Sequence, residues 1–210
     1  MTSVRGLLYM LRTIKFSSLY NAVRTYLDDK PRTIEFKWHF KERLKWEQIR
    51  TARNYALHGW KAIGVGSDER FGDYMIFEKR GFKLAVPLQK LRFFEVYRLE
   101  SLYEPLIEYV DKKIVDVGGF IGETMILFKM WGAEVVEVYE PDPINCEIIK
   151  LNMALNNIVN TKLSRKAVWK KREKVEIGFP SADDLHCQGL TIFADNTSSY
   201  RFCVEAVPVE

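Results

Sequence analysis

Residues 114–124 read Ile-Val-Asp-Val-Gly-Gly-Phe-Ile-Gly-Glu-Thr, and this stretch decides the fold that we expect. An apolar run ends in a glycine-rich turn, and a helical pattern follows the turn. Glycines 118 and 122 let the backbone turn sharply off a strand and leave room for a ligand against the main chain, and Gly119 adds slack. A helix that begins near Gly122 aims its free N–H groups at that ligand. The stretch therefore predicts a strand, a ligand-binding turn and a helix.

An acidic residue stands at the tip of the next predicted strand. This strand covers residues 134–139 and is followed by Glu140, Pro141 and Asp142. An acid about 20 positions past a glycine turn can accept hydrogen bonds from both hydroxyls of a ribose. The strand, the turn, the helix and this acid together predict a nucleoside site rather than a purely structural turn.

The charges around the turn favour a cationic ligand. A dinucleotide site prefers the spacing Gly-x-Gly-x-x-Gly, so that the helix can approach a pyrophosphate, and this turn departs from it. Glu123 in the first helical turn would repel a pyrophosphate. Glu123 and Asp116 both suit a ligand that carries an ammonium and a sulfonium group. We therefore expect S-adenosylmethionine as the cofactor.

Strands and helices alternate along the middle of the chain. The expected elements are strands at 114–117, 134–139 and 163–168 with helices at 122–131 and 143–156, then strands at 174–179 and 202–209. The alternation predicts βαβ units on a parallel sheet, which is an α/β fold. No helical pattern separates the last two strands, so we expect them to form an antiparallel pair.

The first 70 residues predict a basic, mainly helical region in front of an α/β domain at 71–210. Apolar residues recur at spacings of three and four over residues 4–27, and residues 34–60 are rich in aromatic side chains and read as mostly helical. Residues 1–62 hold 13 Lys or Arg and 5 Asp or Glu, a net charge of +8 (13 − 5). Such a segment could contact an anionic surface, phosphate-bearing substrate or nucleic acid, or could be a solvated helix surface.

A β-hairpin and a helix are expected between the basic region and the glycine turn. The runs 74–79 and 82–86 flank Arg80-Gly81, a plausible hairpin turn. A helical pattern over residues 96–109 then leads into the first strand of the α/β domain.

The composition is that of a globular protein. With 210 residues and 47% hydrophobic content, the chain can bury one substantial core. It has no signal-peptide pattern and no run of the roughly 18 to 20 apolar residues that cross a bilayer, so we expect a soluble, cytoplasmic protein. Its three cysteines and three histidines show no disulfide or metal-ligand spacing. We expect reduced thiols and no metal site.

Three segments resemble the FkbM-type S-adenosylmethionine-dependent methyltransferases. They are residues 115–124, residues 138–143 (Val-Tyr-Glu-Pro-Asp-Pro) and residues 150–157 (Lys-Leu-Asn-Met-Ala-Leu-Asn-Asn), within a looser similarity over 99–209. The resemblance implies a Rossmann-like transferase that methylates a hydroxyl of a sugar or another small acceptor.

The resemblance also implies roles for single residues. Asp116, Gly118 and Gly122 would line the methionine part of the cofactor, Glu140 would hold the ribose, and Asp142 or the region of Ala167 would lie near the adenine. The complete set of predicted cofactor-binding residues is Asp116, Gly118, Gly119, Phe120, Gly122, Glu123, Glu140, Pro141, Asp142 and Ala167.

The resemblance ends before the family's pattern does. Family members continue into a strand that bears Asp-Val-Glu-Gly, and no such tetrapeptide occurs before Glu210. We therefore expect a methyltransferase domain without its C-terminal part, either a fragment or a shortened relative. A parallel sheet of three strands would leave an edge for the late strands or a partner chain, as in a homo-oligomer, to cover.

Three functions stay open at this point. The first is O-methylation of a small-molecule or glycan acceptor, and the second is RNA methylation, which the basic residues 1–62 favour but the absence of an Asn-Pro-Pro-Tyr motif disfavours. The third is a truncated, non-catalytic subunit. No catalytic residue is identified, although Asp183 and Asp184 near His186 could supply a general base or simply form a polar turn.

Overall fold

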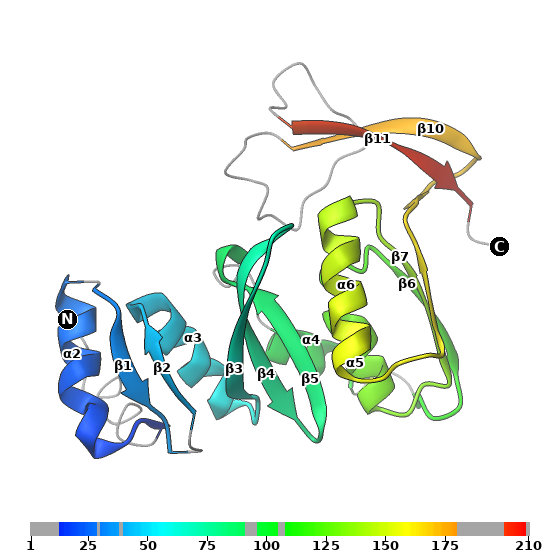
Figure 1. The fold of residues 1–210 in the computed structure, drawn as a ribbon. Coiled ribbons are helices and arrows are strands. Elements are labelled where there is room, and N and C mark those ends of the chain that lie inside the picture. The colour runs from blue at the N-terminus through cyan, green and yellow to red at the C-terminus, as the bar shows by residue number, and fades with distance from the viewer. Residues whose placement is uncertain are drawn as a thin grey trace.

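The parallel sheet around the glycine turn forms as predicted (Figure 1). Strand β6 (Lys113–Val117) pairs in parallel with β7 (Val135–Tyr139), and β7 pairs in parallel with β8 (Thr161–Ser164). Helix α5 (Glu123–Met130) connects β6 to β7, and α6 (Pro143–Leu155) connects β7 to β8. The Rossmann-like α/β class is therefore confirmed. The computed structural model describes residues 13–28, 30–37, 40–90, 96–104, 108–179 and 200–208.

The third predicted strand, at 163–168, is wrong in its extent. It divides into β8 and a second short strand, β9 (Ala167–Val168), which belongs to another sheet. The backbone N–H of Lys166 donates to the carbonyl of Ser164 at 2.8 Å, so the chain bends between the two strands. This bend carries the chain away from the parallel sheet.

The two late strands pair as predicted. Strand β10 (Glu173–Phe179) pairs antiparallel with β11 (Tyr200–Val207), and β11 also pairs in parallel with β9. Figure 1 shows this sheet beyond the carboxyl ends of β6 and β7. Among the described residues, β6 pairs only with β7, and the exposed fractions of Val115 and Val117 are 46% and 56%. The late strands therefore do not cover the edge of the parallel sheet.

The N-terminal region contains two of the expected helices. Helix α2 (Leu19–Asp28) follows the 3₁₀ turn η1 (Phe16–Ser18), and α3 (Trp46–Leu57) lies in the segment 34–60. The part of the predicted helical segment 4–27 that precedes residue 13 lies outside the described residues. No described helix is long and apolar enough to cross a membrane.

The prediction that residues 34–60 are mostly helical is wrong before Trp46. Strands β1 (Arg32–Glu35) and β2 (Lys41–Leu44) form an antiparallel pair there. Ile34 and Phe36 are fully buried, whereas Glu35 between them is half-buried. Burial of alternate residues is the signature of a strand, and the aromatic content of the segment obscured that short alternation.

The predicted hairpin is confirmed and gains a third strand. Strands β4 (Gly72–Lys79) and β5 (Phe82–Pro87) pair around Arg80 and Gly81, whose φ angles of 52° and 83° suit a type I′ turn. Strand β3 (Lys61–Asp68), which was not predicted, pairs antiparallel with β4. This sheet crosses the domain boundary that we predicted at residue 70.

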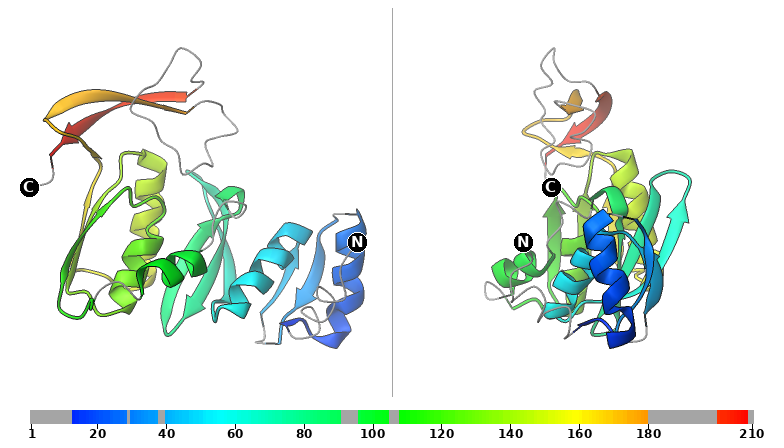
Figure 2. Two further views of the ribbon diagram at one scale, coloured as in Figure 1. Left: turned by 180° about the vertical axis from the view of Figure 1, so that it is seen from behind. Right: turned by 90° about the vertical axis from the view of Figure 1, so that its left-hand side faces the viewer.

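Two short helical segments connect β5 to the α/β core. The 3₁₀ turn η2 (Leu88–Lys90) follows β5 directly. Helix α4 (Val96–Tyr103) is shorter than the helix predicted at 96–109. Helices α5 and α6 both pack against β5, and Figures 1 and 2 show α6 between the antiparallel and parallel sheets.

Two asparagines of α6 join the antiparallel sheet to the core. The Asn152 side chain accepts from the N–H of Ala85 (2.6 Å) and donates to its carbonyl (3.2 Å). The Asn156 side chain makes the same pair of bonds with Lys83, at 2.6 and 2.7 Å. Residues four apart share one face of a helix, so these amides satisfy the edge of β5 as a fourth strand would. Asn152 also donates to the carbonyl of Ile121 (2.8 Å), which ties the glycine turn to the same joint.

We predict that Asn152→Leu lowers the free energy of unfolding by about 3 kcal/mol, because it leaves buried backbone groups of Ala85 and Ile121 without partners. Urea denaturation followed by circular dichroism measures the change. Asn160→Leu is the control, because the Asn160 side chain is exposed. Equal stability of the two variants would contradict a structural role for the Asn152 amide.

Candidate functional site

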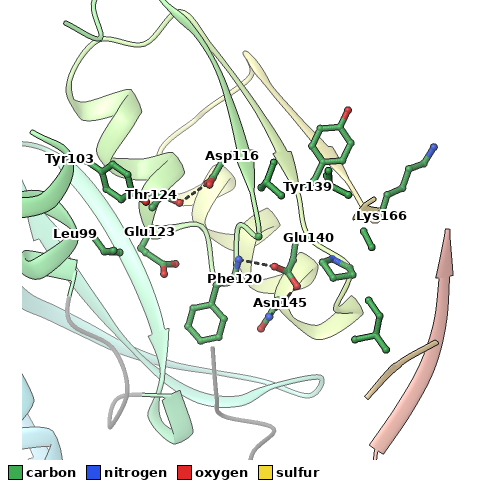
Figure 3. A pocket seen from close by; sticks show the side chains of 16 residues that line it. Leu99, Tyr103, Asp116, Phe120, Glu123, Thr124, Tyr139, Glu140, Asn145 and Lys166 are labelled. Carbon is green, nitrogen blue, oxygen red and sulfur yellow. Dashed lines mark hydrogen bonds between the residues drawn. The ribbon is translucent and has the colours of Figure 1, made fainter. Parts of the chain in front are cut away.

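A cavity of about 410 Å³ lies at the carboxyl ends of β6 and β7 (Figure 3). Ligands of open α/β sheets bind at this end of the strands. Its walls come from α4, the glycine turn, the tip of β7, and strands β9 and β10. Seven of the ten predicted residues line it, namely Asp116, Gly118, Phe120, Glu123, Glu140, Pro141 and Ala167. The sequence pattern therefore located this cavity.

Gly119 and Gly122, the other two predicted glycines, shape the turn without lining the cavity. A Cβ on Gly119 would lie 2.2 Å from Cγ1 of Val138, so the close packing of the turn on β7 requires a glycine. The expectation that Gly119 merely adds slack is therefore wrong. Gly122 caps α5 with a φ of 87°, in the left-handed region that favours glycine. Neither residue lines the cavity.

Glu140 is the centre of the polar contacts in the site. Its carboxylate is buried and accepts from the N–H of Phe120 (2.8 Å), the N–H of Asp142 (2.9 Å) and the side-chain amide of Asn145 (3.3 Å). Two of these bonds fall on Oε1 and one on Oε2, so Oε2 keeps a lone pair for a further donor. Burial raises the pKa of Glu140 to about 7, against the lowering effect of these hydrogen bonds.

Glu123 and Asp116 form a second acidic group on the opposite side of the turn (Figure 3). Glu123 is 4% exposed, and its Oε2 is buried without a hydrogen-bond partner in the described part of the chain. Burial raises the pKa of Glu123 to about 8, and the nearby Asp116 adds to the rise. Asp116 accepts a hydrogen bond from the Thr124 hydroxyl, while burial raises its pKa. A buried carboxylate oxygen without a partner is costly, so Glu123 Oε2 is suited to a cation or a donor from a ligand.

Asp142 has a different position from the one we expected. Its side chain accepts from the N–H groups of Ile144 (2.7 Å) and Asn145 (3.3 Å), which makes it the N-cap of α6. It is buried and does not line the cavity. Ala167, by contrast, lies in an apolar wall with Val168 and Ile177.

Several residues of the site were missed from the sequence. Thr124 stands inside the glycine motif, and the helical pattern at 96–109 held Leu99 and Tyr103, so a signal existed for these three. Asn145 also lines the cavity and gave no signal. Its partner Lys90, outside the lining, gave none either, because only the packing of η2 against α6 brings the two together. The candidate bases Asp183 and Asp184 lie outside the described residues, as does the nearby His186. Within the described ranges, no group of three or more His, Cys, Asp or Glu residues could hold a metal ion.

Comparison with known proteins gives only distant similarity. No protein-family model matches the sequence, and no curated protein is similar to it. Among solved structures, TYW2 from M. jannaschii in complex with AdoMet shares 14% identity at a TM-score of 0.37, over 50% of this chain and 64% of that one. Methyltransferase FkbM from Methylobacillus flagellatus shares 20% identity at a TM-score of 0.35, over 58% and 31%.

A third structure, the M. jannaschii tRNA m1G37 methyltransferase, shares 15% identity at a TM-score of 0.36, over 60% of this chain and 47% of that one. The chain spans less than two thirds of the length of each of these three structures. Membership of the FkbM family stays a prediction. We therefore take the chemistry of the site from its own geometry.

We predict that the unliganded protein loses stability as the pH rises from about 4.5 to about 8. Because the pKa of Glu123 is higher in the folded chain than its ordinary value of 4.5, the native state keeps a proton that the unfolded chain releases in this window. Glu123→Gln should remove roughly 4 kcal/mol of this loss. The part that remains belongs to Glu140 and Asp116, whose pKa values burial also raises. Urea denaturation at pH 5 and pH 8.5 measures it.

Glu134→Gln is the control for that measurement, because Glu134 is exposed near the opposite end of β7. It should lose as much stability with pH as the unchanged protein. The same loss in Glu123→Gln would show that the Glu123 carboxyl is not the buried acid responsible.

Proposed function

We propose that this cavity binds S-adenosylmethionine and that the chain is a methyltransferase domain. The observation that carries the proposal is the placement of three acids around the cavity: Asp116 and Glu140 lie at the carboxyl ends of the adjacent parallel strands β6 and β7, and Glu123 begins α5. One of them has a buried oxygen without a partner, and another keeps a free lone pair. These features suit a ligand that brings a positive charge and a pair of hydroxyls.

Each part of the cofactor has a matching part of the cavity. The free lone pair on Glu140 Oε2 would accept from a ribose hydroxyl, and the apolar wall at Ala167 and Ile177 would contact the adenine. The acids Glu123 and Asp116 would face the ammonium and sulfonium groups. A cation between them would replace the solvation that burial removes, and would favour their ionised forms.

The reaction needs little from the protein beyond alignment. The bound cofactor would supply a methyl group on a sulfonium, and the protein would align an acceptor oxygen with the methyl carbon. The carbon–sulfur bond would break with its electron pair going to sulfur, and the acceptor proton would leave to a base. Cavities of about 300 to 1,000 Å³ usually hold small ligands, so about 410 Å³ suits the cofactor, with the acceptor approaching from the surface. We favour a small hydroxylated acceptor, such as a sugar.

A second candidate is methylation of RNA, which the charge of residues 1–62 favours. Several basic side chains of this region are exposed, among them Lys41, Arg43, Lys45 and Arg50. Binding of RNA through such residues weakens steeply as salt is added, whereas binding of an uncharged acceptor does not. The response of acceptor binding to salt therefore separates the two candidates.

We predict that isothermal titration detects binding of S-adenosylmethionine, and that Glu140→Gln weakens it by about 10-fold to 100-fold through loss of a charge-assisted hydrogen bond. Glu134→Gln, at an exposed position just before β7, should bind as the unchanged protein does. Absence of binding by the unchanged protein would exclude the proposed function. Binding without methyl transfer to any tested acceptor would favour a non-catalytic subunit.

A further inference from the structure

Lys90 is a buried lysine that the proposed function does not use. It is the last residue of η2, it follows β5, and its exposed fraction is 3%. Lysine is almost never buried without a partner. Its ammonium nitrogen donates to Oδ1 of Asn145 at 2.5 Å and lies 4.5 Å from the centre of the Phe120 ring. The chain that leaves the antiparallel sheet of β3, β4 and β5 thus places a cation next to the site.

Both contacts of Lys90 lead to Glu140. Asn145, which accepts from Lys90, donates through its own amide to Glu140 Oε1 at 3.3 Å. Phe120, whose ring faces the ammonium group, donates through its backbone N–H to Glu140 Oε2 at 2.8 Å. Lys90 therefore contacts Asn145 and Phe120, two residues that donate hydrogen bonds to the Glu140 carboxylate.

The charges around Glu140 are mostly acidic. Asp142 stands at the start of α6, Glu123 on α5 and Asp116 on β6, and the thiol of Cys146 donates to the Glu140 carbonyl at 3.2 Å. Among the described residues, the other positive groups near this cluster include Lys166, Arg165 and Lys150. Lys166 forms an ion pair with Glu205 at 3.1 Å, and Lys150 forms one with Glu147 at 2.6 Å.

Lys90 differs from these cations because it is buried within the acidic cluster. Burial lowers its pKa, and attraction from Asp142, Glu140 and Glu123 opposes that effect. A charge that is screened little by water acts more strongly on its neighbours than an exposed one. Lys90 is therefore placed to determine how readily the nearby acids ionise.

We propose that Lys90 is a positioning residue of the cofactor site, which offsets the negative charge of its buried acids and orients Phe120 and Asn145 around Glu140. The inference rests on the proposed binding of S-adenosylmethionine, and it adds that the antiparallel sheet is part of the binding site. Lys90 acts through Glu140 and does not itself contact the cofactor.

The test is the pH dependence of S-adenosylmethionine binding, measured by isothermal titration from pH 6 to pH 9. For the unchanged protein we expect affinity to rise with pH as the acids ionise. Lys90→Met removes the cation, so the acids ionise at higher pH, and the midpoint of the rise should move up by about one pH unit. Affinity near neutral pH should fall by about 10-fold, and the difference should shrink at the alkaline end. Lys90→Arg keeps the charge and should restore the midpoint even where packing weakens binding.

Lys79→Met is the matched control, because Lys79 is a largely buried lysine of the same sheet that pairs with Glu100 at 2.7 Å outside the cavity. Its midpoint should equal that of the unchanged protein. If a folded Lys90→Met variant binds more weakly but its midpoint does not move, Lys90 contributes only packing. That result would overturn this inference and leave the proposed function standing. An equal shift in Lys79→Met would also overturn it. Failure of the unchanged protein to bind at any pH would overturn the proposed function together with the inference.

Discussion

The side-chain amide of Asn152 joins the three parts of the molecule on which the site depends. It pairs with both backbone groups of Ala85 on β5, and it donates to the carbonyl of Ile121 in the glycine turn. Its own residue lies on α6, whose first turn contributes Asn145 to the cavity. Because Lys90 follows Ala85 by only five residues (90 − 85), this pairing also fixes the position of the buried cation. The antiparallel sheet, the helix and the turn are thereby held as one unit.

The site that this joint supports is unfavourable without a ligand. Three acids are gathered around the cavity, and two of them, Glu123 and Glu140, are buried. One oxygen of Glu123 is buried without a partner in the described part of the chain. Folded chains tolerate such costs mainly at functional sites, where a ligand recovers them. Lys90 offsets part of the negative charge of these acids. We infer that a cationic cofactor bound in the cavity offsets the rest. The arrangement of charge, more than the outline of the fold, distinguishes this cavity from a purely structural turn.

The sequence alone predicted those segments whose structure depends on residues close together in the chain. The turn at 118–122 and the acid at the tip of β7 were predictable because glycine conformation and strand length act over a few residues. The break between β8 and β9 was not, since it depends on a single bend at Lys166. Asp142 was misplaced because an acid ahead of Pro143 suits a helix cap as well as a ligand contact. The role of Lys90 could not be predicted, because no residue near it in the sequence indicates that α6 and Phe120 enclose its side chain.

The central claim is that Glu140 holds the ribose of S-adenosylmethionine at the end of β7. A crystal structure of the chain grown with S-adenosylmethionine tests it most directly. The account predicts a ribose hydroxyl within hydrogen-bond distance of Glu140 Oε2, the amino acid part of the cofactor beside Glu123, and the adenine against Ala167. A cofactor bound elsewhere, or bound here with its ribose turned away from Glu140, would contradict it.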